Sequence, residues 1–165
     1  MSKYLIMKRK NKYLSTFVML LLVTLSSSCL KKGLEDYPLF DNNEITLVSA
    51  EYRFNGTQMM NGQPVVAYQQ LTVSQTIDKP NAVINVVITV PAANGQFTAA
   101  EKAKVVKSNL WFFMNISTAA TIAPMEGTPA LGFATDANKP LKYLVTAANG
   151  TSRVWTINVS SFINQ

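Results

Sequence analysis

Apolar residues alternate with polar or smaller ones through much of the chain after residue 44, a period of two that is typical of β-strands with one buried face. Three such runs are Val48 to Phe54, Leu71 to Ile77 and Ile84 to Val90. A further segment, Leu110 to Ile116, is rich in strand-favouring residues. Six or seven short strands of this kind favour an all-β sandwich.

Turn sequences separate these runs, and they are Asn55-Gly56, Asn61 to Pro64, Asp78 to Asn81 and Ala93 to Gly95. We interpret the segment from Asn55 to Pro64 as an exposed hairpin loop, in which Met59 and Met60 offer thioethers suited to adaptable contacts. One short helix is expected after Thr98, because Thr98 and Glu101 have the spacing of a capping box.

The end of the chain predicts a β-hairpin. Tyr143 to Ala147 alternates, Ala148 to Thr151 supplies the turn, and Trp155 to Val159 alternates on the return strand. Trp155 shares a strand face with Ile157 and Val159, so we expect it in the core.

This hairpin also carries a resemblance. Pro140 to Gly150, followed by Val154 to Val159, resembles the closing hairpin of immunoglobulin-like and cadherin-like modules in lipoproteins of the Bacteroidetes. Ile122 to Gly132 resembles the Pro/Gly-rich connector before that hairpin in a domain family of unknown function from those bacteria. The resemblance implies an immunoglobulin-like β-sandwich of about seven strands, a cell-envelope setting and company with outer-membrane glycan-uptake complexes. It implies no catalytic residues, because its motif residues are structural.

The first 28 residues have the features of a signal peptide. Five basic residues precede an apolar run, Tyr13 to Leu25, that is too short to span a bilayer comfortably. Ser26 to Cys29 then resembles the bacterial lipobox, with Ser26 standing where leucine is usual. We therefore predict that Cys29 carries the lipid, and simple secretory cleavage near Ser28 is the alternative.

Lipidation at Cys29 divides the chain into a signal peptide (1–28), a lipidated tether (29–43) and one domain (44–165). Two or more acyl chains hold a protein stably on a bilayer. The expected location is the outer membrane, and whether the domain faces the cell surface or the periplasm is left open.

Charge and composition narrow the function. The formal net charge is +6, but five of the 15 basic residues lie in the signal peptide, which leaves ten against nine acidic residues. A nucleic-acid partner is therefore not predicted. The chain has no histidine and Cys29 is its only cysteine, so imidazole catalysis and thiolate zinc sites are excluded. We predict no enzyme activity, no metal site and no cofactor.

Two groups of acidic residues are candidates for chemistry. Glu126 and Asp136 fall in one long connector and are the least implausible carboxylate pair for hydrolysis, although turn and surface roles are expected. The segment from Asp41 to Glu44 is rich in oxygen ligands but lacks the spacing of a known calcium loop, so we interpret it as a polar turn.

Aromatic residues are the best candidates for binding. Neighbours on a strand point to opposite faces, so the run Trp111-Phe112-Phe113 cannot be buried entirely in one sandwich layer. Either Trp111 and Phe113 face outward or Phe112 does. The candidate contact surface comprises Trp111, Phe113, Met59 and Met60, and a covering loop from the connector at 118–140 is the alternative.

The expected function is a non-catalytic envelope lipoprotein that acts as a structural, adhesion or accessory subunit through a protein partner. The alternative is a carbohydrate-binding accessory lipoprotein of an outer-membrane glycan-uptake system, in which flat aromatic side chains stack on sugar rings.

Overall fold

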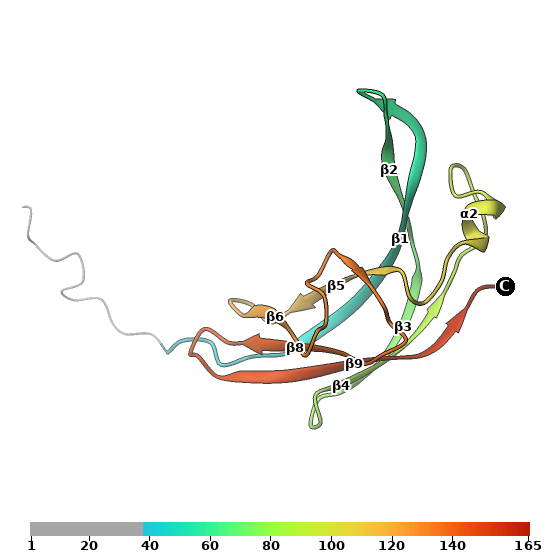
Figure 1. The fold of residues 1–165 in the computed structure, drawn as a ribbon. Coiled ribbons are helices and arrows are strands. Elements are labelled where there is room, and N and C mark those ends of the chain that lie inside the picture. Colours follow the sequence, from blue (N-terminus) through green and yellow to red (C-terminus); the bar gives the residue numbers. More distant parts are fainter. Residues whose placement is uncertain (1–37) are drawn as a thin grey trace, which may run out of the picture. The chain divides into compact units, whose positions relative to one another are not determined.

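The computed structural model describes residues 38–165, and this part of the chain folds as two β-sheets packed face to face (Figure 1). Sheet A has the order β2-β1-β5-β7, formed by Gln63–Gln70, Ile45–Met60, Leu110–Ile116 and Ala134–Thr135. Sheet B has the order β3-β4-β9-β8-β6, formed by Thr72–Asp78, Val83–Thr89, Ser152–Ile163, Leu141–Thr146 and Thr121–Met125. The prediction of an all-β sandwich is confirmed.

The number of strands exceeds the expected seven because the connector before the final hairpin contributes two short strands, β6 and β7. Neighbouring strands run antiparallel except β4 and β9, which are parallel. The predicted signal peptide, Cys29 and most of the predicted tether lie outside the described residues.

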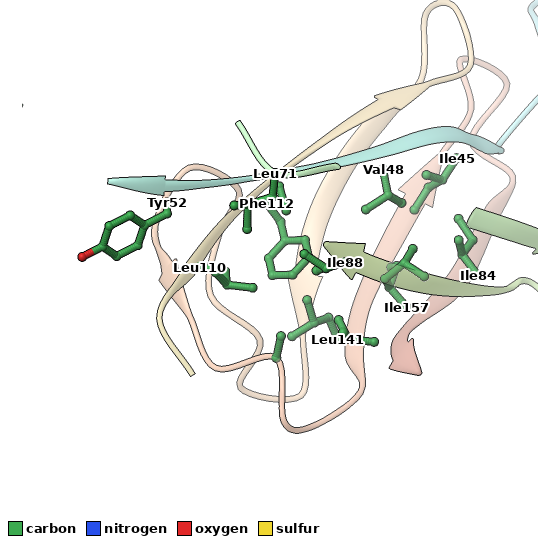
Figure 2. Close-up of a cluster of buried hydrophobic side chains, with 14 of the residues drawn as sticks. Ile45, Val48, Tyr52, Leu71, Ile84, Ile88, Leu110, Phe112, Leu141 and Ile157 are labelled. Carbon is green, nitrogen blue, oxygen red and sulfur yellow. The ribbon is translucent and has the colours of Figure 1, made fainter. Parts of the chain in front are cut away.

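The core lies between the inner faces of the two sheets (Figure 2). Val48 and Phe112 from sheet A face Ile84, Ile88 and Ile157 from sheet B, and all five are essentially inaccessible to solvent. The period-two spacing of Val48, Ile84, Ile88 and Ile157 is the pattern of the sequence, and these alternating positions are buried as predicted.

Trp155 is a core residue, as predicted, with no exposed surface. Its indole N–H donates to the backbone carbonyl of Asn43 at 2.9 Å, which ties the segment before β1 to sheet B. The same segment meets the hairpin turn, where the backbone N–H of Asn149 donates to the carbonyl of Phe40 at 3.1 Å. The end of the predicted tether therefore contacts the domain through Phe40 and Asn43.

A side-chain amide joins the two sheets. Gln75 of β3 accepts a hydrogen bond from the backbone N–H of Val48 at 2.8 Å and donates to the carbonyl of Thr46 at 3.1 Å. Both partners lie on β1, so this one amide pairs with the β1 backbone as a neighbouring strand would. The bridge stands near the crossing point where the chain leaves sheet A after Gln70 and enters sheet B at Thr72.

The predicted helix is present as α2 (Ala99–Ala103), and the Thr98 hydroxyl accepts from the Glu101 backbone N–H at 3.2 Å. The Glu101 carboxylate pairs with Lys104 at 2.6 Å and accepts from the Tyr52 hydroxyl at 3.3 Å. Burial, followed by the Glu101 charge, raises the pKa of Tyr52. This contact fastens the short helix to sheet A.

The prediction of a hairpin loop from Asn55 to Pro64 is wrong. β1 continues to Met60, and the turn is confined to Asn61 and Gly62, whose φ angles are +50° and +77°. Asn55-Gly56 lies inside β1 at an irregularity in the register with β2. The strands form a long arm, visible in Figure 1 as the β1–β2 hairpin that extends from the rest of sheet A.

Candidate binding face

The sequence left open which aromatic residues of β5 lie on the outer face of sheet A. The burial pattern along β5 answers this question. Leu110 and Phe112 are buried in the core, so Trp111 and Phe113 point outward and lie half-buried on the outer face. On the next strand, Glu51 pairs with Trp111 and Ser49 pairs with Phe113. The choice left open between Trp111 and Phe112 thus resolves in favour of Trp111 and Phe113.

A charged pair from β1 lies against these rings. The Arg53 Nε–H donates to the Glu51 carboxylate at 2.6 Å, and the guanidinium carbon is 5.7 Å from the ring centroids of both Trp111 and Phe113. This is the geometry of a cation–π contact. Arg53 therefore covers part of both aromatic faces. The connector borders the same rings, since β7 pairs with the edge of β5 and Gly132 lies beside Phe113.

Beyond Arg53, β2 adds apolar side chains to the same face. Tyr68 pairs with Arg53 and Val66 pairs with Asn55, and their exposed fractions are 65% and 62%. Two such exposed side chains next to half-buried aromatic rings form a continuous surface of mixed apolar and charged character. We call this surface, formed by Glu51, Arg53, Val66, Tyr68, Trp111 and Phe113, the outer-A face.

The outer-A face is hollowed where β2 leaves the sheet. A shallow, open depression of about 260 Å³ lies between the rings of Tyr68 and Phe113, and its polar lining comes from Ser49, Glu51 and Gln70. The lining combines two aromatic rings with a hydroxyl, a carboxylate and an amide. Such a set can contact an apolar surface and accept or donate hydrogen bonds beside it.

The two methionines divide between the faces of the arm. Met59 pairs with Pro64, so it shares the face of Val66 and Tyr68, whereas Met60 is the next residue along the strand and pairs with Gln63. Both are well exposed. The structure thus brings Trp111, Phe113 and Met59 to one face of sheet A and places Met60 on the other.

Sequence reasoning missed Arg53 and Tyr68 as members of this face. A signal was present, because Val66, Tyr68 and Gln70 recur at every second position. No strand was predicted between Pro64 and Leu71, so these residues were not assigned to a sheet face.

The acidic residues named as candidates are engaged in local contacts. The Glu126 carboxylate pairs with Lys142 at 2.6 Å. Asp136 accepts from the backbone N–H and side-chain amide of Asn138 at 3.0 and 2.8 Å, and these hydrogen bonds lower its pKa. Both residues border one shallow depression, but an Asp that stays ionised is a poor general acid.

The oxygen-rich segment at Asp41 to Glu44 also contacts the domain through an ion pair and hydrogen bonds. The Glu44 carboxylate accepts from the Lys79 ammonium at 2.8 Å, and the carbonyls of Asp41 and Asn43 accept from Thr151 and Trp155. Within residues 38–165, no cluster of three or more acidic residues is arranged to hold a metal ion.

Comparison with known proteins identifies a family and a similar solved structure. The model of the family described as DUF5018-related matches residues 45–158. A crystal structure from Bacteroides fragilis, of a protein described as a candidate secreted protein, is 40% identical and has a TM-score of 0.70; the match covers 76% of this chain and 99% of that one. No curated protein matches the chain significantly. Residues 38–165 contain no helix with the length and apolarity needed to cross a membrane.

Proposed function

The chain belongs to the DUF5018-related family, and from that premise we propose that it is a non-catalytic lipoprotein of the cell envelope, working as a structural, adhesion or accessory subunit bound to a protein partner. The relative from Bacteroides fragilis, described as a candidate secreted protein, supports an extracytoplasmic location. Cys29 carries the lipid in this proposal, and the sandwich is immunoglobulin-like, as the resemblance of the closing hairpin implies.

The observation that carries the proposal is the composition of the outer-A face. Tyr, Trp and Arg are the residues most enriched among those that dominate binding energy at protein interfaces, and Tyr68, Trp111 and Arg53 are neighbours on this surface. Glu51 neutralises Arg53. The partner that fits is a protein surface of low net charge with exposed apolar side chains.

The location of Arg53 favours a protein over a sugar as the ligand of Trp111. A sugar ring stacks on a free aromatic face, whereas the guanidinium of Arg53 already lies 5.7 Å from the centroids of Trp111 and Phe113. A protein side chain can pack beside this arrangement without displacing it.

Site-specific crosslinking in living cells tests the proposal. A photoreactive residue placed at Tyr68 or Trp111 should capture one stoichiometric protein, while the same residue at Thr76, which is exposed on the outer face of sheet B, should not. The purified companion should then bind the Tyr68→Ala variant at least about tenfold more weakly, as expected of a central interface residue. Equal capture from Thr76, or recovery of the free monomer alone, would count against the proposal.

Location and lipidation are tested separately. Labelled fatty acid should be incorporated into the wild type but not into Cys29→Ser, whose product should no longer pellet with membranes. Protease digestion of an epitope-tagged protein on intact cells would place the domain at the cell surface, and protection until lysis would place it in the periplasm. Equal membrane association of the wild type and Cys29→Ser would contradict the lipid anchor.

The depression between Tyr68 and Phe113 supports carbohydrate as a second candidate ligand, because it combines two rings with the Glu51 carboxylate and the Gln70 amide. This alternative predicts saturable oligosaccharide binding that Tyr68→Ala and Gln70→Ala both weaken. Trp111→Ala should matter less, since Arg53 covers its ring. Calorimetry that finds no binding across a broad set of glycans would remove the alternative.

A further inference from the structure

β2 forms one edge of sheet A, and within residues 38–165 no other strand pairs with its outer side. The backbone N–H of Leu71 donates to the carbonyl of Ala50 at 2.9 Å, which fixes the alternation of the ladder with β1. Odd-numbered residues of β2 therefore direct their N–H and C=O groups toward β1. Val66, Tyr68 and Gln70 direct theirs toward the free edge.

Of the features that usually prevent strand pairing, charged side chains are absent from this edge, and its one proline, Pro64, is the second residue of the strand. The eight residues of β2 include no charged side chain, and Val66 and Tyr68 are both well exposed. The edges of sheet B differ, because β3 ends in Asp78 and β6 carries Pro124 in its interior. Among these three edges, β2 is the one suited to accept another strand.

We propose that two copies of this chain pair through their β2 strands, antiparallel, about a two-fold axis that passes beside Ala67. In this register Val66 lies opposite the partner's Tyr68, and each such pair exchanges two backbone hydrogen bonds. An aromatic side chain opposite a β-branched one is a favourable cross-strand pair. Because β2 is uncharged, self-pairing brings no like charges together.

The two ends of β2 complement each other in the same register. Pro64, which has no N–H, lies opposite the partner's Gln70, whose carbonyl already accepts from the Gln69 side-chain amide at 2.9 Å in the free chain. The Gln70 N–H can still donate to the Pro64 carbonyl. A shift of the axis to Val66 would instead place Pro64 opposite Tyr68 and leave the Tyr68 carbonyl without a donor. Of these two registers, the sequence of β2 fits the one about Ala67.

The space beside the edge is open. A shallow depression of about 250 Å³ borders β2, lined by Val65 to Tyr68 together with Gln58 and Gln96. The proposed pairing would join two four-stranded sheets into one of eight strands, with both outer-A faces on the same side. Val66 and Tyr68 also belong to the outer-A face, so a photoreactive residue at Tyr68 would capture a second copy if the strands pair, whereas one at Trp111, away from the β2 edge, reports on the protein partner alone.

Single cysteines in the full-length protein, produced in cells that export it, test both the pairing and its register. Two residues at position 67 would lie directly opposite each other in a pair without backbone hydrogen bonds, with Cα atoms about 4.5 Å apart, which is within disulfide range. Ala67→Cys should therefore give a disulfide-linked dimer on a non-reducing gel. The wild type, with Cys29 alone, is the background.

Gln69→Cys is the matched control on the same strand. Two residues at position 69 would be displaced by four residues, about 13 Å, so this variant should stay monomeric. Co-production of Gln69→Cys with Val65→Cys should restore a crosslink, because these positions lie opposite each other in the proposed register. An Ala67→Cys protein that stays monomeric, or crosslinking of Gln69→Cys alone to the same extent, would overturn the proposal.

Val66→Pro provides a test without cysteines. Its N–H faces the free edge, so proline there should leave the ladder with β1 intact and block the second strand. Two differently tagged wild-type copies should copurify from detergent-solubilised membranes, and two tagged Val66→Pro copies should lose at least about nine-tenths of that signal. Undiminished copurification of a folded Val66→Pro protein would refute pairing through β2.

Discussion

Replacement of Trp155 tests whether one buried indole anchors the final hairpin to the segment before β1. Trp155 has no exposed surface, and its N–H donates to Asn43 at 2.9 Å. Trp155→Ala removes the packing and the hydrogen bond together, which typically lowers the free energy of unfolding by about 3–5 kcal/mol. Trp155→Phe keeps most of the packing but loses the hydrogen bond, worth about 1 kcal/mol, and about 1 kcal/mol of ring contacts.

Trp111→Phe is the matched control, because Trp111 is the second of the two tryptophans and lies half-buried on the outer-A face. Its expected cost is below about 1 kcal/mol. In urea, with a slope of about 2 kcal/mol per molar, Trp155→Ala should lower the midpoint by about 2 M and Trp155→Phe by about 1 M. The protein for this assay is the unlipidated Cys29→Ser chain.

Fluorescence gives an independent readout, since each variant leaves a single tryptophan. Emission from Trp155 in Trp111→Phe should be blue-shifted and resistant to iodide, and emission from Trp111 in Trp155→Phe should be quenched more readily. If Trp155→Phe costs no more than Trp111→Phe, or if iodide quenches both tryptophans equally, the assignment of Trp155 as the anchor of the hairpin is refuted.

Three further outcomes are expected. Burial raises the pKa of Tyr143 to about 12. The free energy of unfolding should therefore be unaffected below pH 10 and fall by about 3 kcal/mol between pH 10 and 12, because only the unfolded state deprotonates in that range. Urea titrations at several pH values should show a weaker pH dependence for Tyr143→Phe, and an unchanged pH dependence would contradict this. Gly56→Ala should lower the free energy of unfolding by about 1–3 kcal/mol, because a Cβ would meet the Val65 carbonyl at 2.9 Å; a thermal midpoint equal to the wild type would show that the arm relaxes freely. Thr98→Ala should cost about 1 kcal/mol through loss of the helix cap, with Thr98→Ser as the near-neutral control, and equal losses in both would argue against capping.

Local sequence was sufficient for most elements. The alternation at Ile84 to Val90 and Tyr143 to Ala147 predicted strands whose buried faces are the ones observed, because side chains on a strand alternate with a period of two whatever surrounds them. The cap at Thr98 followed from hydrogen bonds between residues three apart. Such signals involve only near neighbours and need no knowledge of the rest of the chain.

The error at Asn55-Gly56 shows where local signals stop. Asn-Gly tolerates the positive φ angles of a tight turn, but it does not require them. Pairing with β2 satisfies the backbone of this segment as strand, and the absence of a Gly56 side chain allows the Val65 carbonyl and Gln96 to approach. The tertiary contact, rather than the dipeptide, set the conformation.

The sequence by itself determined that this chain has an all-β domain, that Cys29 is its only thiol and that imidazole chemistry is absent, because these follow from composition and short-range periodicity. Tertiary structure decided which of three adjacent aromatic residues faces outward, since Trp111, Phe112 and Phe113 are all apolar and only the packing of β5 on sheet B chooses among them. It also brought Arg53 onto the rings and left β2 at a free edge. Those features depend on strand order and register, which are set by contacts between residues far apart in the sequence.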